Sequence, residues 1–197
     1  MAFDPENPAQ KLHLAPTQHD SASDQPSDSA LVDAARSGDR ASFGILYQRY
    51  ARMVHGVLLS RVPPAATDDL VQDVFIQALR RLTTLRDGSR FGGWIAAIAR
   101  NRATDYFRQA PPEVPLAAED AEDIASASVD RGEAEAVLSA LQRLPGAYRE
   151  TLILRLVEGM SGPEIAARTG LTPGSVRVNL HRGMQQLRQA LGLKEKP

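Results

Sequence analysis

Cysteine is absent from the 197 residues of this chain, and its absence excludes several kinds of chemistry. Without thiols there is no disulfide framework, no thiolate metal site and no cysteine nucleophile, which fits a reducing cytosol. The four histidines are scattered without a metal-ligand spacing, and no glycine-rich phosphate loop follows a strand pattern. Acidic residues gather in a connector and at a helix start rather than as paired carboxylates in a pocket. We therefore predict no enzymatic activity, no metal site and no cofactor.

Long apolar runs are also missing. No segment approaches the length of a membrane span, and the N-terminus lacks the basic-then-apolar pattern of a signal peptide. No convincing strand pattern is present, whereas apolar residues recur repeatedly at helical spacing. The chain is predicted to be all-α, cytoplasmic and not inserted in a membrane.

The net charge of −1 conceals a strong alternation of charge along the chain. Residues 1–29 carry five acids and one base, and residues 111–135 carry eight acids and one base. Between and after them, residues 30–110 carry twelve bases and seven acids, and residues 136–197 carry nine bases and four acids. Two basic blocks suit a polyanion held at two places. Nearly all the bases are arginine, which favours bidentate contacts with phosphate and guanine, although arginine use can also follow genomic base composition.

Composition divides the chain into four parts. Residues 1–28 are polar, contain several prolines and lack a periodic apolar face, so a disordered extension is predicted. Two small helical domains are expected over 29–109 and 132–193. Residues 110–131 open with prolines and continue acidic, which is typical of a flexible linker.

In the first domain, helical spacing predicts a short helix that stops at Gly38, followed by helices over about 40–60, 68–82 and 92–108. Predicted N-caps are Ser29, Asp39 and Thr67. Tyr47, Leu79 and Trp94 are assigned to buried faces, and His55 is expected to be simply exposed.

The helix over 68–82 has an opposite, polar face composed of Asp69, Gln72, Asp73, Ile76 and Arg80. An isoleucine among acids and an amide hints at a partner surface, although a solitary exposed isoleucine also occurs by chance.

A basic loop, Arg86–Arg90, leads into the last helix of this domain. The polar side of that helix carries Arg100, Asn101, Arg102, Asp105 and Arg108. Such a loop and helix beside aromatic residues can hold unstacked bases. A solvated basic helix accounts for the same composition.

The most informative stretch is 158–182, which reads as two helices joined by a tight turn. Ser161 opens a capping box, and Gly170 supplies the left-handed residue that ends the first helix. Thr172 caps the second helix, with Pro173 at its first position. The inward positions of that helix are Val176, Leu180, Met184 and Leu187. This layout predicts a helix-turn-helix, whose second helix offers side chains to major-groove base edges; an ordinary helical hairpin is the bland alternative.

These segments together resemble bacterial RNA polymerase sigma factors. Leu46–Tyr50, Asp68–Phe75, Arg90–Asn101 and Asp105–Arg108 are similar to region two of that family. Leu144–Glu150, Glu158–Ser161 and the helix-turn-helix are similar to region four. The order of the motifs, with only a short connector between them, resembles the extracytoplasmic-function (ECF) group.

The resemblance implies a factor that binds core RNA polymerase, recognises the minus-35 and minus-10 promoter elements and directs transcription initiation. The implied polymerase contacts are Asp69, Gln72, Asp73 and Ile76. The implied minus-10 contacts are Arg86, Asp87, Ser89, Arg90, Arg100, Asn101 and Arg108, with Arg102 supporting. The implied minus-35 contacts are Pro173, Ser175, Arg177, Asn179, His181 and Arg182. A monomer when active and an anti-sigma factor as a further partner are expected by the same resemblance.

The chain departs from the family pattern in two places. Val178-Asn179-Leu180 stands where many relatives have Ser-Arg-Leu, so one commonly basic contact is absent and the minus-35 sequence preference cannot be carried over. Gly92-Gly93 weakens the start of its helix. Two alternatives stay open: a two-domain helix-turn-helix repressor or activator acting without polymerase, and a co-regulator that binds polymerase without opening a promoter.

Overall fold

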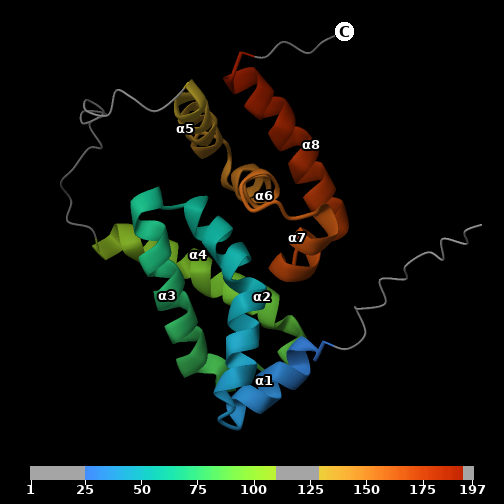
Figure 1. Cartoon of the computed structure of the whole chain (residues 1–197). Helices are drawn as coiled ribbons and strands as arrows, with labels where there is room; N and C mark the ends of the chain where they lie inside the picture. Colours follow the sequence, from blue (N-terminus) through green and yellow to red (C-terminus); the bar gives the residue numbers. More distant parts are fainter. Residues whose placement is uncertain (1–24, 110–128, 193–197) are drawn as a thin grey trace, which may run out of the picture.

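The computed structural model describes residues 25–109 and 129–192 (Figure 1). In these two ranges all regular structure is helical, which confirms the all-α prediction. None of the helices there is both long and apolar enough to cross a bilayer. The predictions for residues 1–24 and for the linker segment 110–128 concern parts of the chain outside the described residues.

The N-terminal bundle contains α1 (Asp28–Arg36), α2 (Arg40–Leu59), α3 (Pro64–Arg81) and α4 (Phe91–Gln109), with short 3-10 turns η1 (Leu82–Thr84) and η2 (Gly88–Arg90) before α4. Helix α2 packs against each of the other three helices. The core of this N-terminal bundle includes the fully buried side chains of Leu46, Met53, Val54, Phe91 and Ile95. Burying each such side chain contributes about 1.5–3 kcal/mol, so this core is sufficient to hold the loop before α4 in place.

The C-terminal bundle contains α5 (Val129–Gln142), α6 (Gly146–Leu156), α7 (Gly162–Thr169) and α8 (Pro173–Ala190). Helix α6 is central and contacts the other three. Gly183 of α8 lies so close to α6 that a Cβ there would be 3.0 Å from Leu152 Cδ1 and 3.1 Å from Tyr148 Cβ. This close packing fixes one side of α8 against α6 and leaves the other side free.

Two predicted N-caps are wrong. Ser27, not Ser29, caps α1, because its hydroxyl accepts a hydrogen bond from Ala30 N at 3.2 Å. Helix α3 begins at Pro64, a turn before the predicted start, since proline is tolerated at a first helical position where no N–H is needed. Thr67 is therefore a buried residue within the helix, and its hydroxyl donates to Pro63 O at 3.2 Å.

Some predicted buried residues lie at the surface instead. Leu79 of α3 is 51% exposed and Tyr47 of α2 is 40% exposed, although one side of Tyr47 packs on Phe75 with ring centroids 4.5 Å apart. Leu156, at the end of α6, is also 46% exposed. In each case the bundle is narrower than the apolar stripe of the helix, so the edge of the stripe stays in solvent.

The two bundles pack against each other (Figure 1). Helix α2 contacts α6 and α7, α4 contacts α7, and a single buried cluster joins the N-terminal core to Leu154, Met160 and Ile165. A Cβ on Gly56 would lie 2.7 Å from Leu154 Cδ2, and one on Gly92 would lie 2.5 Å from the Arg168 carbonyl oxygen. Small residues thus allow the close approach, which the sequence patterns did not predict.

Candidate nucleic-acid interface

The helix-turn-helix forms where the local signals predict it. The hydroxyl of Ser161 accepts from Glu164 N at 3.3 Å, and Ser161 N donates to Glu164 Oε2 at 2.8 Å, which completes the capping box. Gly170 ends α7 with φ of 75°, a conformation that other residues rarely adopt. Thr172 then caps α8 by accepting from Ser175 N at 3.1 Å. These contacts fix the angle at which α8 leaves the turn.

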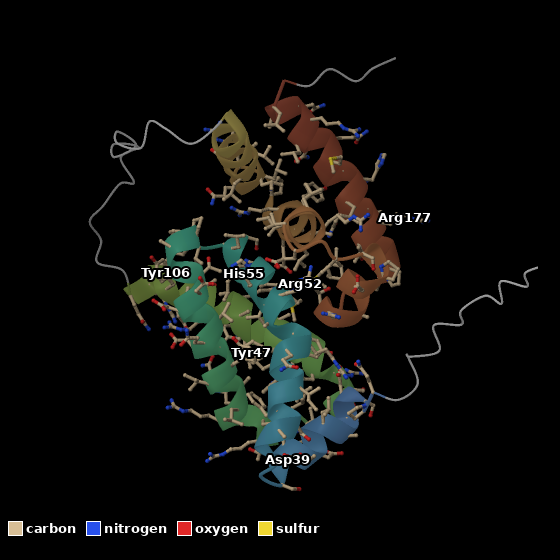
Figure 2. All side chains as sticks on the ribbon, viewed as in Figure 1. Asp39, Tyr47, Arg52, His55, Tyr106 and Arg177 are labelled. Atoms are coloured by element: carbon tan, nitrogen blue, oxygen red, sulfur yellow. The ribbon has the colours of Figure 1, made fainter. Side chains whose placement is uncertain are left out.

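The outward side of α8 collects most of the predicted minus-35 residues. Pro173, Ser175, Arg177, His181 and Arg182 are exposed, whereas Val176 and Leu187 are buried on the opposite side. Figure 2 shows Arg177 on the outer side of α8. Asn179 is only half-exposed, and its amide nitrogen lies 3.4 Å from Thr151 Oγ1 on α6. The structure therefore turns Asn179 toward the side of α8 that faces α6.

Beside α8 lies a groove of about 1200 Å³, bordered by α7 and α8. Its wall is mostly apolar, with Pro163, Ala166, Leu171, Leu180 and Met184 among the lining residues. Arginines 155, 177 and 188 also line it, and no acidic residue does. Arg177 thus belongs both to the outward row of α8 and to this groove.

In the N-terminal bundle, the loop before α4 is shaped by Asp87. Its carboxylate accepts from Ser89 N at 3.0 Å and from Ser89 Oγ at 2.6 Å, and the hydroxyl bond is the main cause that lowers the pKa of Asp87. Arg90 lies 3.3 Å from the same carboxylate, and both Arg86 and Arg90 are exposed. Asp87 and Ser89 therefore form the turn, and both arginines are exposed beside it, with Arg90 also paired with Asp87.

On α4 the predicted minus-10 residues divide between two sides. Asn101 and Arg108 are exposed and border a hollow of about 370 Å³ with Gln77 and Arg81 of α3. Arg108 also pairs with Asp105. Arg100, the residue before Asn101, instead points toward α6 of the other bundle. The structure brings Asn101 and Arg108 together and keeps Arg100 apart from them.

The predicted polymerase-binding face of α3 is exposed at Asp69, Gln72 and Ile76, and Ile76 is 50% exposed. Asp73 is less free, because Arg102 of α4 approaches its Oδ2 with Nη2 at 2.6 Å and Nε at 3.2 Å. Leu79, one turn further along α3, extends the apolar part of the face. Leu79 was predicted to be buried, although its spacing of three residues from Ile76 is compatible with one side of a helix and could have indicated this larger patch.

Sequence reasoning missed the role of Glu150. This α6 residue is 5% exposed at the contact between the bundles. Arg100 donates to it from Nη2 at 2.6 Å and from Nε at 3.1 Å, and Arg61, in the turn after α2, donates from Nη2 at 2.9 Å. Burial raises the pKa of Glu150, but the arginines together outweigh burial and hold that pKa below its usual value. Glu150 is therefore an ionised carboxylate. It pairs with Arg100, which was predicted to contact minus-10 DNA.

His55 is the second missed residue, since it is not simply exposed. Its Nδ1 lies 2.6 Å from Glu158 Oε1 of the C-terminal bundle, and Nε2 lies 3.8 Å from the exposed Asp68 carboxylate. The hydrogen bond to Glu158 raises the pKa of His55 against the opposing effect of burial. Figure 2 shows His55 at the level where the two bundles meet.

The fold and these surfaces define a two-bundle protein in which a helix-turn-helix is combined with a separate basic loop and helix. Residues 46–111 match the family described as Sigma-70 region 2, and residues 134–187 match Sigma-70, region 4. The chain belongs to the sigma-70 family of RNA polymerase sigma factors.

Known relatives refine this assignment to the ECF group. The chain is 36% identical over 166 residues to the RNA polymerase sigma factor CarQ of Myxococcus xanthus, covering 82% of this chain and 95% of that protein. It is 30% identical over 190 residues to the ECF RNA polymerase sigma-E factor of Escherichia coli K12, covering 89% and 97%. Among solved structures it is similar to CnrH, in complex with the cytosolic domain of CnrY, with 28% identity, a TM-score of 0.58 and coverage of 85% and 99%.

These findings confirm the resemblance drawn from the motifs. The protein is an ECF-type sigma factor, and members of this family are transcription regulators rather than enzymes. The comparisons do not favour the alternative of a helix-turn-helix repressor or activator.

Proposed function

We propose that the two bundles bind different partners within one initiation complex. The exposed face of α3 binds core RNA polymerase, the loop before α4 captures melted minus-10 bases, and the outward row of α8 reads the minus-35 duplex. The observation that supports this most directly is that one chain carries two separate exposed arginine-bearing surfaces, on α8 and on the loop Arg86–Arg90.

On α8, Arg177, His181 and Arg182 carry the duplex contacts. They lie within the first ten residues of the second helix of a helix-turn-helix, and the N-terminal part of this helix is the part that reaches base edges in the major groove. An arginine that binds guanine in a bidentate manner contributes about 1–3 kcal/mol of discrimination. Asn179 has a supporting role, since its position toward α6 limits its reach.

On the N-terminal bundle, Arg86 and Arg90 bind the backbone of the displaced strand, while Asp87 and Ser89 shape the turn. Asn101 and Arg108 stand beside the hollow between α3 and α4, where an unstacked base can meet an amide and a guanidinium. On α3, Asp69, Gln72 and the apolar pair Ile76 and Leu79 suit a polymerase surface that is itself apolar at its centre and basic at its rim.

In the packed arrangement the two bundles lie too close together for the protein to bind the minus-35 and minus-10 elements at the same time. The names of the elements place them about 25 base pairs apart, or about 85 Å at about 3.4 Å per base pair. A Cβ on Gly170 would lie 3.4 Å from Gly93 Cα. The two Cα atoms are therefore within about 5 Å, and Arg90 and Thr172, three and two residues away, are within roughly 25 Å.

The bundles must therefore separate when the promoter is bound. The chain from Gln109 to Val129 contains about twenty residue steps and can span at most roughly 70 Å, which together with the size of each bundle is enough. Separation breaks the contacts of Glu150 and frees Arg100 to join the DNA-binding surface. In this view the described structure is the form that precedes promoter binding.

We call the arrangement in which the two bundles pack together the closed form. We propose that an anti-sigma factor binds the protein in this form. The similarity to CnrH, solved with the cytosolic domain of CnrY, supports it. The groove beside α8 suits an amphipathic helix with acidic flanks, because its wall is apolar and its charged lining residues are arginines. Since Arg177 lines this groove, such a helix would compete with minus-35 DNA.

In-vitro transcription tests the proposal. Core bacterial RNA polymerase, with and without the protein, is supplied with a pooled library of upstream DNA fragments. Discrete transcripts that depend on the protein are expected, and their start sites reveal the minus-35 and minus-10 sequences. Tight duplex binding by the protein alone, without new transcripts, would instead support a polymerase-independent regulator.

A further inference from the structure

Val178 is an apolar side chain at the centre of the most polar surface of the C-terminal bundle. It is the sixth residue of α8 and is 44% exposed. Two residues after the buried Val176, it is turned by about 200° around the helix axis and stands on the outward side, in the row of His181 and Arg182. It belongs to neither buried cluster of the structure.

Nothing in the fold of α8 explains a valine at this position. A β-branched side chain in the middle of a helix is slightly less favourable than a straight-chain one, because its χ1 rotation is restricted. Its methyl groups are left in water, so burial does not offset this cost. The position therefore suits a partner that covers the side chain in a complex.

The surroundings of Val178 indicate the chemistry of that partner. Helix α8 contains arginines and a histidine and no acidic residue, so its outward side favours a polyanion. In the major groove of duplex DNA the apolar group that a side chain can contact is the 5-methyl group of thymine. A valine flanked by Arg177 and Arg182 combines phosphate or guanine contacts with one apolar contact.

We propose that Val178 determines minus-35 specificity by packing against a thymine 5-methyl group. This inference rests on the proposed function, because it assigns one contact within the proposed duplex-reading surface. It also gives part of the departure from the family pattern a role, because Val178 stands where many relatives have serine.

The test uses holoenzyme, formed from the full chain and core polymerase, on a promoter obtained from the pooled transcription library. Each thymine of its minus-35 element is replaced singly by deoxyuridine, which removes the 5-methyl group and keeps the base-pairing edge. Competition binding then measures the affinity of each duplex. One position should lose about three- to fivefold, the effect expected for one buried methyl group.

The protein side is tested by Val178→Ser, in a double-mutant cycle with the sensitive thymine. The variant should bind the thymine and deoxyuridine duplexes equally, at the weaker affinity. Val157→Ser is the matched control, because Val157 is 51% exposed and lies outside α8. That variant should keep the wild-type preference for thymine.

Three results would overturn the inference while leaving the sigma function intact: no thymine is sensitive, the sensitivity survives in Val178→Ser, or Val178→Ser weakens every template equally. The last result would place Val178 against a protein partner. Absence of any protein-dependent transcript would instead count against the proposed function itself.

Discussion

Replacement of Glu150 by glutamine tests whether this carboxylate holds the two bundles together. The change keeps the size of the side chain and removes the charge that Arg100 and Arg61 bind at 2.6–3.1 Å. Breaking a buried ion pair on one side typically costs 3–5 kcal/mol. Here the arginine side chains are 28% and 34% exposed, so water compensates part of this loss.

We therefore expect the closed form to lose about 1–3 kcal/mol relative to the separated form, which shifts the equilibrium by roughly five- to 150-fold. The chain has no cysteine, so two spin labels can be placed through Arg80→Cys on α3 and Gln189→Cys on α8, both at exposed positions. Pulsed electron spin resonance should show one narrow distance distribution in the parent and an additional, broader distribution in Glu150→Gln.

Asp33→Asn is the control for Glu150→Gln, because it also removes one negative charge but affects only an exposed pair with Arg36 inside the N-terminal bundle. Its distance distribution should match that of the parent. Identical distributions for Glu150→Gln and the parent would refute the argument that Glu150 stabilises the closed form. A second consequence checks the same reasoning: Glu150→Gln should need less core polymerase for half-maximal transcription.

Three further changes probe other parts of the structure. The pKa of His55 is raised in the closed form, so the stabilisation that His55 gives is complete below its ordinary pKa of about 6.5 and is lost as pH rises through the raised value. The narrow distance distribution of the spin labels should therefore become less populated above neutrality, and this pH dependence should be weaker in His55→Ala. Gly92→Ala should lower the melting temperature and reduce the free energy of unfolding by about 1–3 kcal/mol, because the new Cβ would meet Arg168 O at 2.5 Å and Tyr50 Cε1 at 2.8 Å. Gly44→Ala, also helical but with nothing within 4 Å, should stabilise by up to about 1 kcal/mol. Arg177→Ala should weaken binding of the minus-35 duplex by about 1–3 kcal/mol, measured by competition with holoenzyme.

Each of these expectations has a contrary outcome. A closed population independent of pH in the parent would show that the bond from His55 to Glu158 has no net effect on the packing. Equal melting temperatures for the alanine variants at 92 and 44 would mean that the backbone of α7 moves aside without cost. Undiminished transcription by Arg177→Ala from its cognate promoter would remove this arginine from the reading surface.

Helix ends that depend on neighbouring residues could be predicted from the sequence. Asp39, the capping box at Ser161, the left-handed Gly170 and the cap at Thr172 all act within four residues of their partners, and the structure confirms each. Ser29 failed because Ser27, two residues earlier, offers the same hydroxyl, and the choice depends on how α1 packs. Exposure at the edge of an apolar stripe, as at Leu79, is likewise decided by the width of the bundle.

The exposure of most residues on the faces proposed for DNA and polymerase could be predicted, because the spacing within one helix or loop determines it. The contacts of Glu150 and His55 were not, since their partners are 50 to 103 residues away in the sequence. A buried glutamate on an amphipathic helix has no local signature that distinguishes it from a solvated one. Such pairs become visible only when the packing of the bundles is known.

The paired glycines at the start of α4 have a consequence for conformational entropy. Gly92 must lack a Cβ in either form because Tyr50 of its own bundle is close, whereas Gly93 faces Gly170 of α7 in the closed form. Each glycine makes a helix about 1 kcal/mol less favourable than alanine does. Once the bundles separate, nothing from α7 supports the first turn of α4. Phe91, which is buried in the N-terminal core, then remains the anchor of that turn, so the proposed separation gives the two glycines more conformational freedom without detaching the start of α4 from its own bundle.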